Sequence, residues 1–365
     1  MFRKRWSGAL LVNGTLLLLV IIWSIPTLGL FISSFRTRFD IQSSGWWTIF
    51  PHRTWETVKV LQPKDLGLDP TGVMAVEGVQ GTFEQLREGI ESPSGDTRVT
   101  WVGNRRLGQV EVQKKTWAVA LNFNLDNYKT VLSTGDYEIT RPDGTVEVVP
   151  GQGLSQAFLN SMAVAIPSTI IPILIAAFAA YAFSWMSFPG RRILFIMIVG
   201  LLVVPLQIAL VPILRDYNRI GLNGTFLAVW LAHTGFGLAL ATYLLFNYIS
   251  TIPREILESA FIDGASPFTV FLQLVLPLSV PALASFAIFQ FLWVWNDYLV
   301  ALVFLGVDPS YKVLTQRLAD ITGTFGSDWH LLTAGAFISM LLPLTVFFAL
   351  QRYFVRGLMA GSVKG

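Results

Sequence analysis

The sequence predicts an all-α membrane protein with six transmembrane helices and a small β-rich domain inserted between the first two. Of its 365 residues, 53% are hydrophobic and only 13% are charged, whereas soluble domains contain about 25% charged residues. Six long windows contain no Asp, Glu, Lys or Arg, and about 20 apolar residues in a helix cross the hydrocarbon core of a bilayer. A polar segment over residues 36–154 separates the first window from the other five.

The six windows are predicted to be helical because a backbone in lipid must satisfy its own N–H and C=O groups. We place the helices at about residues 9–34, 157–184, 193–214, 225–248, 279–304 and 332–351. The first window follows Arg3, Lys4 and Arg5, as the apolar core of a signal peptide would. It is too long for one, contains Pro26 and is followed by no small-residue cleavage site, so we favour a retained signal-anchor.

Lysine and arginine in the short loops predict the orientation, because cytoplasmic loops carry an excess of these residues. With the N-terminus inside, nine of them lie on the cytoplasmic side and four in the short outer loops. Both termini are then cytoplasmic, and the net charge of +3 reflects basic membrane edges, with nothing to favour a nucleic-acid partner. The chain divides into residues 1–35 (N-terminus and first helix), 36–154 (extracytoplasmic insertion), 155–351 (helices two to six, with a cytoplasmic loop at 249–277) and 352–365 (cytoplasmic tail).

The insertion is predicted to be β-rich. Residues Thr97–Trp101 and Val110–Val112 alternate in the manner of strands. Pro142-Asp143-Gly144 separates two further strand-like runs, Tyr137–Thr140 and Val146–Val149, which indicates a hairpin turn. The alternative is a partly disordered loop.

The cytoplasmic loop over 251–268 is predicted to form a helix, a sharp corner and a second helix. Pro253 and Glu255 suit the first turn of a helix. Gly264 can adopt the left-handed conformation that ends it, and Ser266-Pro267 can cap and start the next one. Such a corner can dock into a cleft on a soluble partner, or the two helices can lie as an ordinary amphipathic pair at the membrane surface.

This loop resembles the "EAA" signature by which permeases of ABC importers contact their ATPase subunits. The similar run is Glu258-Ser-Ala260-Phe-Ile-Asp263-Gly264-Ala, followed by Leu276-Pro277 and Pro281; Ser259 stands where the family has alanine. Other segments are similar to the six-helix carbohydrate permease of the maltose-transporter type, and most similar to its α-glucoside branch. They are Asn124-Leu-Asp-Asn127-Tyr128, Trp185-Met-Ser-Phe-Pro-Gly190-Arg191, Trp230-Leu-Ala-His233-Thr-Gly-Phe-Gly237, Trp295-Asn296-Asp297 and Val355-Arg-Gly357 with the tail after it.

The resemblance implies a permease subunit of a type I ABC importer in the cell membrane, which carries an α-glucoside or a glucose-containing oligosaccharide by alternating access. Its implied partners are a homologous second permease, two ATPase subunits that hold ATP and Mg, and an extracytoplasmic solute-binding protein. Residues 253–268 would form the helix that couples to the ATPase, through Glu258, Ala260, Asp263, Gly264 and Phe268. The tail residues Gly361, Val363, Lys364 and Gly365 would reach toward the ATPase dimer.

Five polar residues inside the predicted helices are candidates for the translocation pathway: Gln207, His233, Gln290, Asn296 and Asp297. An ionisable residue inside a membrane is costly and is by default a functional candidate. Each also has a structural interpretation, since Asp297 can cap or bend a helix, His233 can be a packed histidine and glutamines can form interhelical hydrogen bonds.

Several chemistries are excluded by missing residues. The chain has no cysteine, only three histidines and no Gly-Lys dipeptide of a phosphate-binding loop. We therefore expect neither catalysis nor a metal or cofactor on this chain. The rival function is an ion-coupled secondary sugar transporter, which would need charged or unwound elements within its helices.

Overall fold

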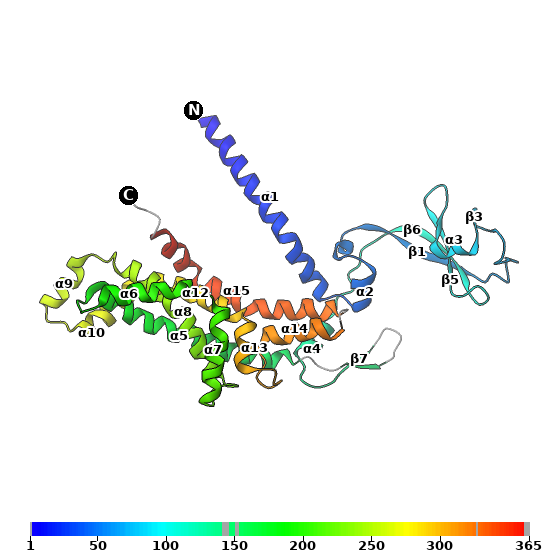
Figure 1. Ribbon diagram of the computed structural model, residues 1–365. Helices are drawn as coiled ribbons and strands as arrows, with labels where there is room; N and C mark the ends of the chain where they lie inside the picture. The colour runs from blue at the N-terminus through cyan, green and yellow to red at the C-terminus, as the bar shows by residue number, and fades with distance from the viewer. Residues whose placement is uncertain (1, 141–145, 150–152, 326–327, 361–365) are drawn as a thin grey trace. The chain divides into compact units, whose positions relative to one another are not determined.

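The computed structural model describes residues 2–140, 146–149, 153–325 and 328–360. The chain divides between Phe123 and Asn124 into two compact units. The elements of both are labelled in Figure 1. The division falls inside the segment that the sequence assigns to the insertion, so the described residues from Asn124 onward belong to the second unit.

The first unit begins with a long apolar helix, α1 (Phe2–Ser34). The hydroxyls of Thr15 and Ser24 donate hydrogen bonds to carbonyl groups four residues earlier, so the helix itself satisfies these two polar groups. The short helices α2 (Arg38–Ser43) and η1 (Trp46–Ile49) follow and lead into the inserted domain.

The inserted domain is built on a four-stranded antiparallel sheet in the order β1 (His52–Leu61), β6 (Gln109–Ala118), β5 (Thr97–Val102) and β4 (Ile90–Glu91). A hairpin of β2 (Met74–Val76) and β3 (Val79–Gly81) and the helix α3 (Phe83–Glu88) complete it. Trp101, Leu86 and Val110 are among its fully buried side chains. The predicted strands at Thr97–Trp101 and Val110–Val112 are therefore confirmed, and they pair with each other.

The described residues of the second unit form helices and one hairpin, of β7 (Tyr137–Thr140) and β8 (Val146–Val149). These strands pair as predicted, while the turn residues 142–144 lie outside the described ones. The helices are α4 (Asp126–Leu132), α5 (Leu154–Trp185), α6 (Arg191–Gly200), η2 (Leu201–Val203), α7 (Leu206–Arg219), α8 (Phe226–Ile249), α9 (Arg254–Ile262), α10 (Pro267–Val270), η3 (Phe271–Val275), α11 (Leu276–Leu278), α12 (Val280–Trp295), α13 (Leu299–Leu305), α14 (Leu314–Phe325) and α15 (Trp329–Ala360).

Four helices in the described part of the chain are long and apolar enough to cross a membrane: α1, α5, α8 and α15. Two bent helix pairs raise this number to six among the described residues if each pair forms one span. The helix predicted over 193–214 turns by 104° between α6–η2 and α7. Its break falls at Val204, which precedes Pro205 and is extended, as residues before proline are.

The helix predicted over 279–304 is also not continuous. It is interrupted at residues 296–298, between α12 and α13. At its other end, α12 meets the segment Pro267–Leu278 at a bend of 70°, close to Ser279, which lies between Pro277 and Pro281.

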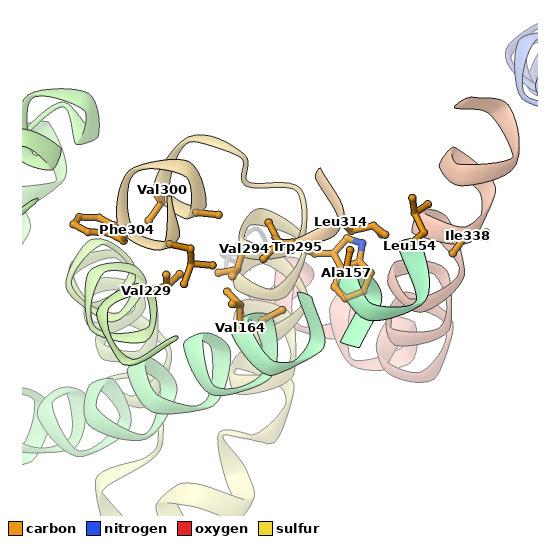
Figure 2. Close-up of a cluster of buried hydrophobic side chains, with 14 of the residues drawn as sticks. Leu154, Ala157, Val164, Val229, Val294, Trp295, Val300, Phe304, Leu314 and Ile338 are labelled. Atoms are coloured by element: carbon orange, nitrogen blue, oxygen red, sulfur yellow. The ribbon is translucent and has the colours of Figure 1, made fainter. Parts of the chain in front are cut away.

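Two apolar clusters hold the second unit together. The larger joins α5, α8, α12, α13, α14 and α15, and Figure 2 shows Val229, Val300 and Phe304 in one part of it and Trp295, Leu314 and Leu154 in another. The other cluster joins α5, α8 and α12 to the α9–α11 segment. Burial of this apolar surface fixes the positions of the two candidate sites described next.

Candidate functional site

The loop that carries the EAA-like sequence forms a corner between two short helices, here called the elbow (residues 253–268). Gly264 has φ of +82°, the left-handed conformation that ends α9. The Ala265 N–H donates to the Ala260 carbonyl across the corner, at 3.0 Å. The Ser266 hydroxyl then accepts from the Thr269 N–H at 3.1 Å and caps α10. The predicted helix, corner and second helix are confirmed.

The elbow presents its predicted contact residues outward. Glu258, Asp263, Gly264 and Phe268 are exposed, and Ala260 is half-buried. Sequence reasoning missed Ile262, the most exposed large apolar side chain of the elbow at 85%. The available signal was its position beside Asp263, on the face of α9 away from the buried Leu257. An apolar tip flanked by two carboxylates is chemically suited to dock into a protein groove.

The base of the elbow is anchored in the helical unit. Leu257 is fully buried, and it packs in the same cluster as Val270 and Phe271. That cluster also contains Tyr181 of α5 and Leu245 of α8. A displacement of the elbow must therefore move side chains that belong to two spans, because a close-packed interior transmits strain.

A stack of aromatic rings links α10 and η3 to α5. Phe178 of α5 lies parallel to Phe268, with ring centroids 6.3 Å apart and planes 5° apart. Its centroid is 4.3 Å from that of Phe271, which in turn lies 5.5 Å from Tyr181. The sequence motifs gave no indication of Phe178, since only tertiary packing brings it to the elbow.

Three of the five predicted pathway residues meet in the core of the helical unit. The imidazole Nε2 of His233 lies 3.8 Å from a carboxylate oxygen of Asp297. The amide nitrogen of Gln290 donates to the main-chain carbonyls of Ser168 and His233, at 3.2 and 3.4 Å. His233 and Gln290 are each only 1% exposed. These side chains tie α5, α8, α12 and the break after α12 into one polar cluster.

Asp297 also has a local role at this break. One of its carboxylate oxygens accepts a hydrogen bond from the Ala301 N–H in the first turn of α13, at 3.1 Å. Its main-chain carbonyl accepts from the Thr315 hydroxyl at 2.7 Å. The carboxylate thus caps α13 while facing His233, so both interpretations of the sequence are compatible with the geometry.

The other two pathway candidates lie apart from this cluster. Asn296 is exposed, and its amide donates back to the Leu292 carbonyl of its own helix. Gln207 is exposed near the start of α7. The tail residues Gly361, Val363, Lys364 and Gly365 lie outside the described residues.

An open, mostly apolar cleft of about 610 Å³ adjoins the polar cluster. It lies between the bent η2–α7 segment and the helices α8 and α12, and Gln290, Gly235 and Gly237 line it. A second cavity, of about 10 Å³, is lined by His233 and Asp297 and is large enough for about one water molecule. In the described part of the chain, no three Asp, Glu or His side chains gather as they would around a metal ion.

Known transport proteins are similar to this chain over nearly its whole length. The family described as binding-protein-dependent transport system inner membrane component matches residues 158–359. The alpha-glucoside transport system permease protein AglG of Rhizobium meliloti (strain 1021) is 46% identical over 384 aligned residues, which cover 97% of each chain. The osmoprotective compounds uptake permease protein GgtD of Synechocystis sp. (strain ATCC 27184 / PCC 6803 / Kazusa) is 45% identical, over 97% of this chain and 91% of its own.

Among solved structures, a bacterial ABC transporter that imports the acidic polysaccharide alginate matches 65% of this chain and 82% of its own, at 19% identity and a TM-score of 0.49. The family match, by contrast, spans more than half of this chain and contains the elbow, the polar cluster and most of α5 to α15. The chain is thus a multi-pass membrane permease of the ABC-importer class, and it belongs to the family of inner membrane components of binding-protein-dependent transport systems.

Proposed function

We propose that this chain forms half of the translocation pathway of an importer for α-glucosides or glucose-containing oligosaccharides. The observation that carries the proposal is the elbow, with an exposed tip and a buried base, inside the region that matches the permease family. The 46% identity to a permease named for alpha-glucoside transport, over 97% of each chain, supports the substrate class.

Energy for transport comes from partner subunits in this proposal. Two ATPase subunits, which hold ATP and Mg, bind the elbows of this chain and of a homologous second permease on the cytoplasmic side. Their closure on ATP displaces the elbow, and the buried base transfers that displacement to α5 and α8. The permease pair then shifts between inward-facing and outward-facing states, because ATP binds one state more tightly than the other. An extracytoplasmic binding protein delivers the sugar.

The sugar pathway in this chain runs along the cleft of about 610 Å³ beside α8 and α12. The apolar lining suits the C–H faces of a sugar ring, and Gln290 at its edge is a hydrogen-bonding group. His233 and Asp297 hold the wall of the cleft by joining α8 to the break after α12. The second permease supplies the opposite wall.

Uptake into vesicles tests the proposal against the ion-coupled alternative. Vesicles that contain the assembled complex and its binding protein receive ATP on the elbow side without an ion gradient, and a labelled α-glucoside outside. Uptake that requires ATP is expected. Uptake that ignores ATP and follows a proton or sodium gradient would reject the ABC mechanism. A panel of α-glucosides and osmoprotective compounds, assayed for binding to the solute receptor, tests the substrate class separately.

A further inference from the structure

One face of the β1–β6 ribbon carries an alternating array of tryptophans and cations. In the antiparallel register, Arg53 lies opposite Trp117 and Trp55 lies opposite Lys115. Because side chains alternate between the two faces of a strand, these four side chains share one face. The Arg53 guanidinium lies 5.5 Å from the centroid of the Trp117 ring, and the Lys115 ammonium lies 5.0 Å from that of Trp55.

Both cations and one of the two tryptophans on this face are exposed to solvent. Trp117 is 69% exposed, and Arg53 and Lys115 are exposed as well. No ion pair recorded for the described residues includes either cation. Two carboxylates share this face: Glu111, which accepts a hydrogen bond from the Thr57 hydroxyl at 3.0 Å, and Asp96, which stands opposite Lys115 in the sheet. Neither forms an ion pair with Arg53 or Lys115, so both cations and the two indole rings are available to a phosphate-bearing surface.

The base of the same ribbon is fixed to the end of the first membrane helix. The indole of Trp46 in η1 packs so closely on Gly29 of α1 that a Cβ there would lie 2.6 Å from it. The Ala120 N–H, just past β6, donates to the Thr48 carbonyl of η1 at 2.9 Å. Phe35, just past α1, contacts Phe123 edge-to-face at 6.4 Å.

The Arg53–Trp117 pair consequently lies within reach of lipid headgroups, and the Trp55–Lys115 pair reaches them when the ribbon lies along the bilayer surface. At about 3.3 Å per residue, the Arg53–Trp117 and Trp55–Lys115 pairs stand roughly 3 and 10 Å beyond the first pair of the ribbon, His52 with Ala118. The headgroup layer on each side of a bilayer is about 5–7 Å thick. Trp47 and Phe50, beside the base, are 60% and 58% exposed, as expected of aromatic residues that enter the interface.

We infer that this face of the β1–β6 ribbon binds the phosphate groups of the phospholipid surface at which α1 ends, so that the inserted domain rests on the bilayer. Tryptophan with lysine and arginine is the residue combination that membrane interfaces favour, and anionic lipid attracts each nearby cation. The inference does not depend on the identity of the transported solute.

The absence of cysteine from the chain allows a direct test with single introduced labels. Thr57→Cys lies on the array face of β1 and Thr54→Cys on the opposite face of the same strand. Each variant is spin-labelled in the assembled complex, in nanodiscs of phosphatidylcholine with and without phosphatidylglycerol. We expect collisions with a water-soluble nickel chelate to be several-fold fewer at position 57 than at position 54, and collisions with oxygen to be more frequent. Anionic lipid is expected to increase the difference and high salt to reduce it.

Charge reversal tests whether Arg53 and Lys115 bind the ribbon to the lipid surface. The double variant Arg53→Glu/Lys115→Glu is expected to abolish the difference between the two labels. The control Lys64→Glu/Arg106→Glu makes the same change of charge elsewhere on the domain and is expected to preserve it. Equal chelate access at positions 57 and 54 in every lipid would overturn the inference. Protection of position 57 only after the solute-binding protein is added would also overturn it, and would assign the face to that protein.

Discussion

At the scale of single residues, the buried amide of Gln290 explains why α8 has glycine at position 237. A Cβ on Gly237 would lie 2.7 Å from the amide nitrogen and oxygen of Gln290. That amide donates hydrogen bonds to two carbonyl groups, one on α5 and one on α8. Moving it leaves buried polar groups unpaired, at about 1–3 kcal/mol for each group.

We therefore predict that Gly237→Ala lowers the melting temperature of the purified protein, with a loss of about 1–3 kcal/mol. Gly235→Ala is the matched control, because a Cβ at position 235 meets no atom within 4 Å. In a Gln290→Ala background the cost of Gly237→Ala is expected to shrink. Equal melting temperatures for the two glycine variants would show that the amide is not constrained.

Gly264 is the residue on which the shape of the elbow depends. Its φ of +82° is strained for any residue with a Cβ, by about 1 kcal/mol, and least for asparagine. No atom crowds the position, so backbone strain is the only direct effect of a small side chain.

We expect Gly264→Asn to reduce coupled transport least, Gly264→Ala more and Gly264→Val most. The ATPase subunits are expected to continue to hydrolyse ATP in all three variants. The measurement is sugar uptake per ATP hydrolysed in vesicles. Gly190→Ala serves as the control, since Gly190 is also exposed and has φ of +80° but lies outside the elbow. If Gly190→Ala uncoupled transport as strongly as Gly264→Ala, the loss of coupling would come from backbone strain at any such glycine and not from the shape of the elbow.

At the scale of elements, the stack on Phe178 is a direct connection between the elbow and α5. Phe178→Ala removes the ring that faces both Phe268 and Phe271. We predict that it reduces uptake per ATP several-fold while the complex still assembles, and that Phe178→Tyr retains coupling. Leu174→Ala, one turn earlier on α5 and 51% exposed, is the control for loss of a lipid-facing side chain. Uncoupling by Leu174→Ala to the same degree would argue against transmission through the stack.

Local signals in the sequence were sufficient to predict the membrane helices and the elbow, but not the bends between helices. Charge-free windows identify the membrane helices because composition alone decides whether a helix can enter lipid. The elbow was predictable since Gly264, Ser266 and Pro267 act on their own backbone. The 104° bend at Val204 was not predicted, because proline is tolerated inside many membrane helices.

The tertiary contacts of the candidate sites could not be predicted from the sequence. Gln290 and His233 are 57 residues apart in the chain, and the sequence offers no measure of which helix faces meet. The same holds for Phe178 and Phe268, which meet only because α5 and the α9–α11 segment share one apolar cluster. The sequence predicts that Asp297 caps a helix or faces the pathway, and the structure shows its carboxylate bonded to the Ala301 N–H of α13 and 3.8 Å from the His233 imidazole.

At the scale of the whole molecule, the elbow and the segment that contains α14 lie at opposite ends of the helical unit (Figure 1). The positive-inside pattern predicts which end is cytoplasmic. Ser266→Cys in the elbow is expected to react with a membrane-impermeant thiol reagent only in inside-out vesicles. Ser94→Cys, in the inserted domain, is expected to react only in right-side-out vesicles. The reverse pattern would invert the orientation and place the elbow out of reach of cytoplasmic ATPases.

The first-to-last strand pairing of the inserted domain has a consequence for how such permeases diversify. His52, where the domain begins, stands opposite Ala118, where it finishes. Its entry and exit are neighbours, so the whole module can be lengthened, shortened or replaced by a brief turn without moving the two chain ends that join it to the rest of the protein. The inserted domain can therefore change in size or sequence during evolution while the helical unit keeps its own packing.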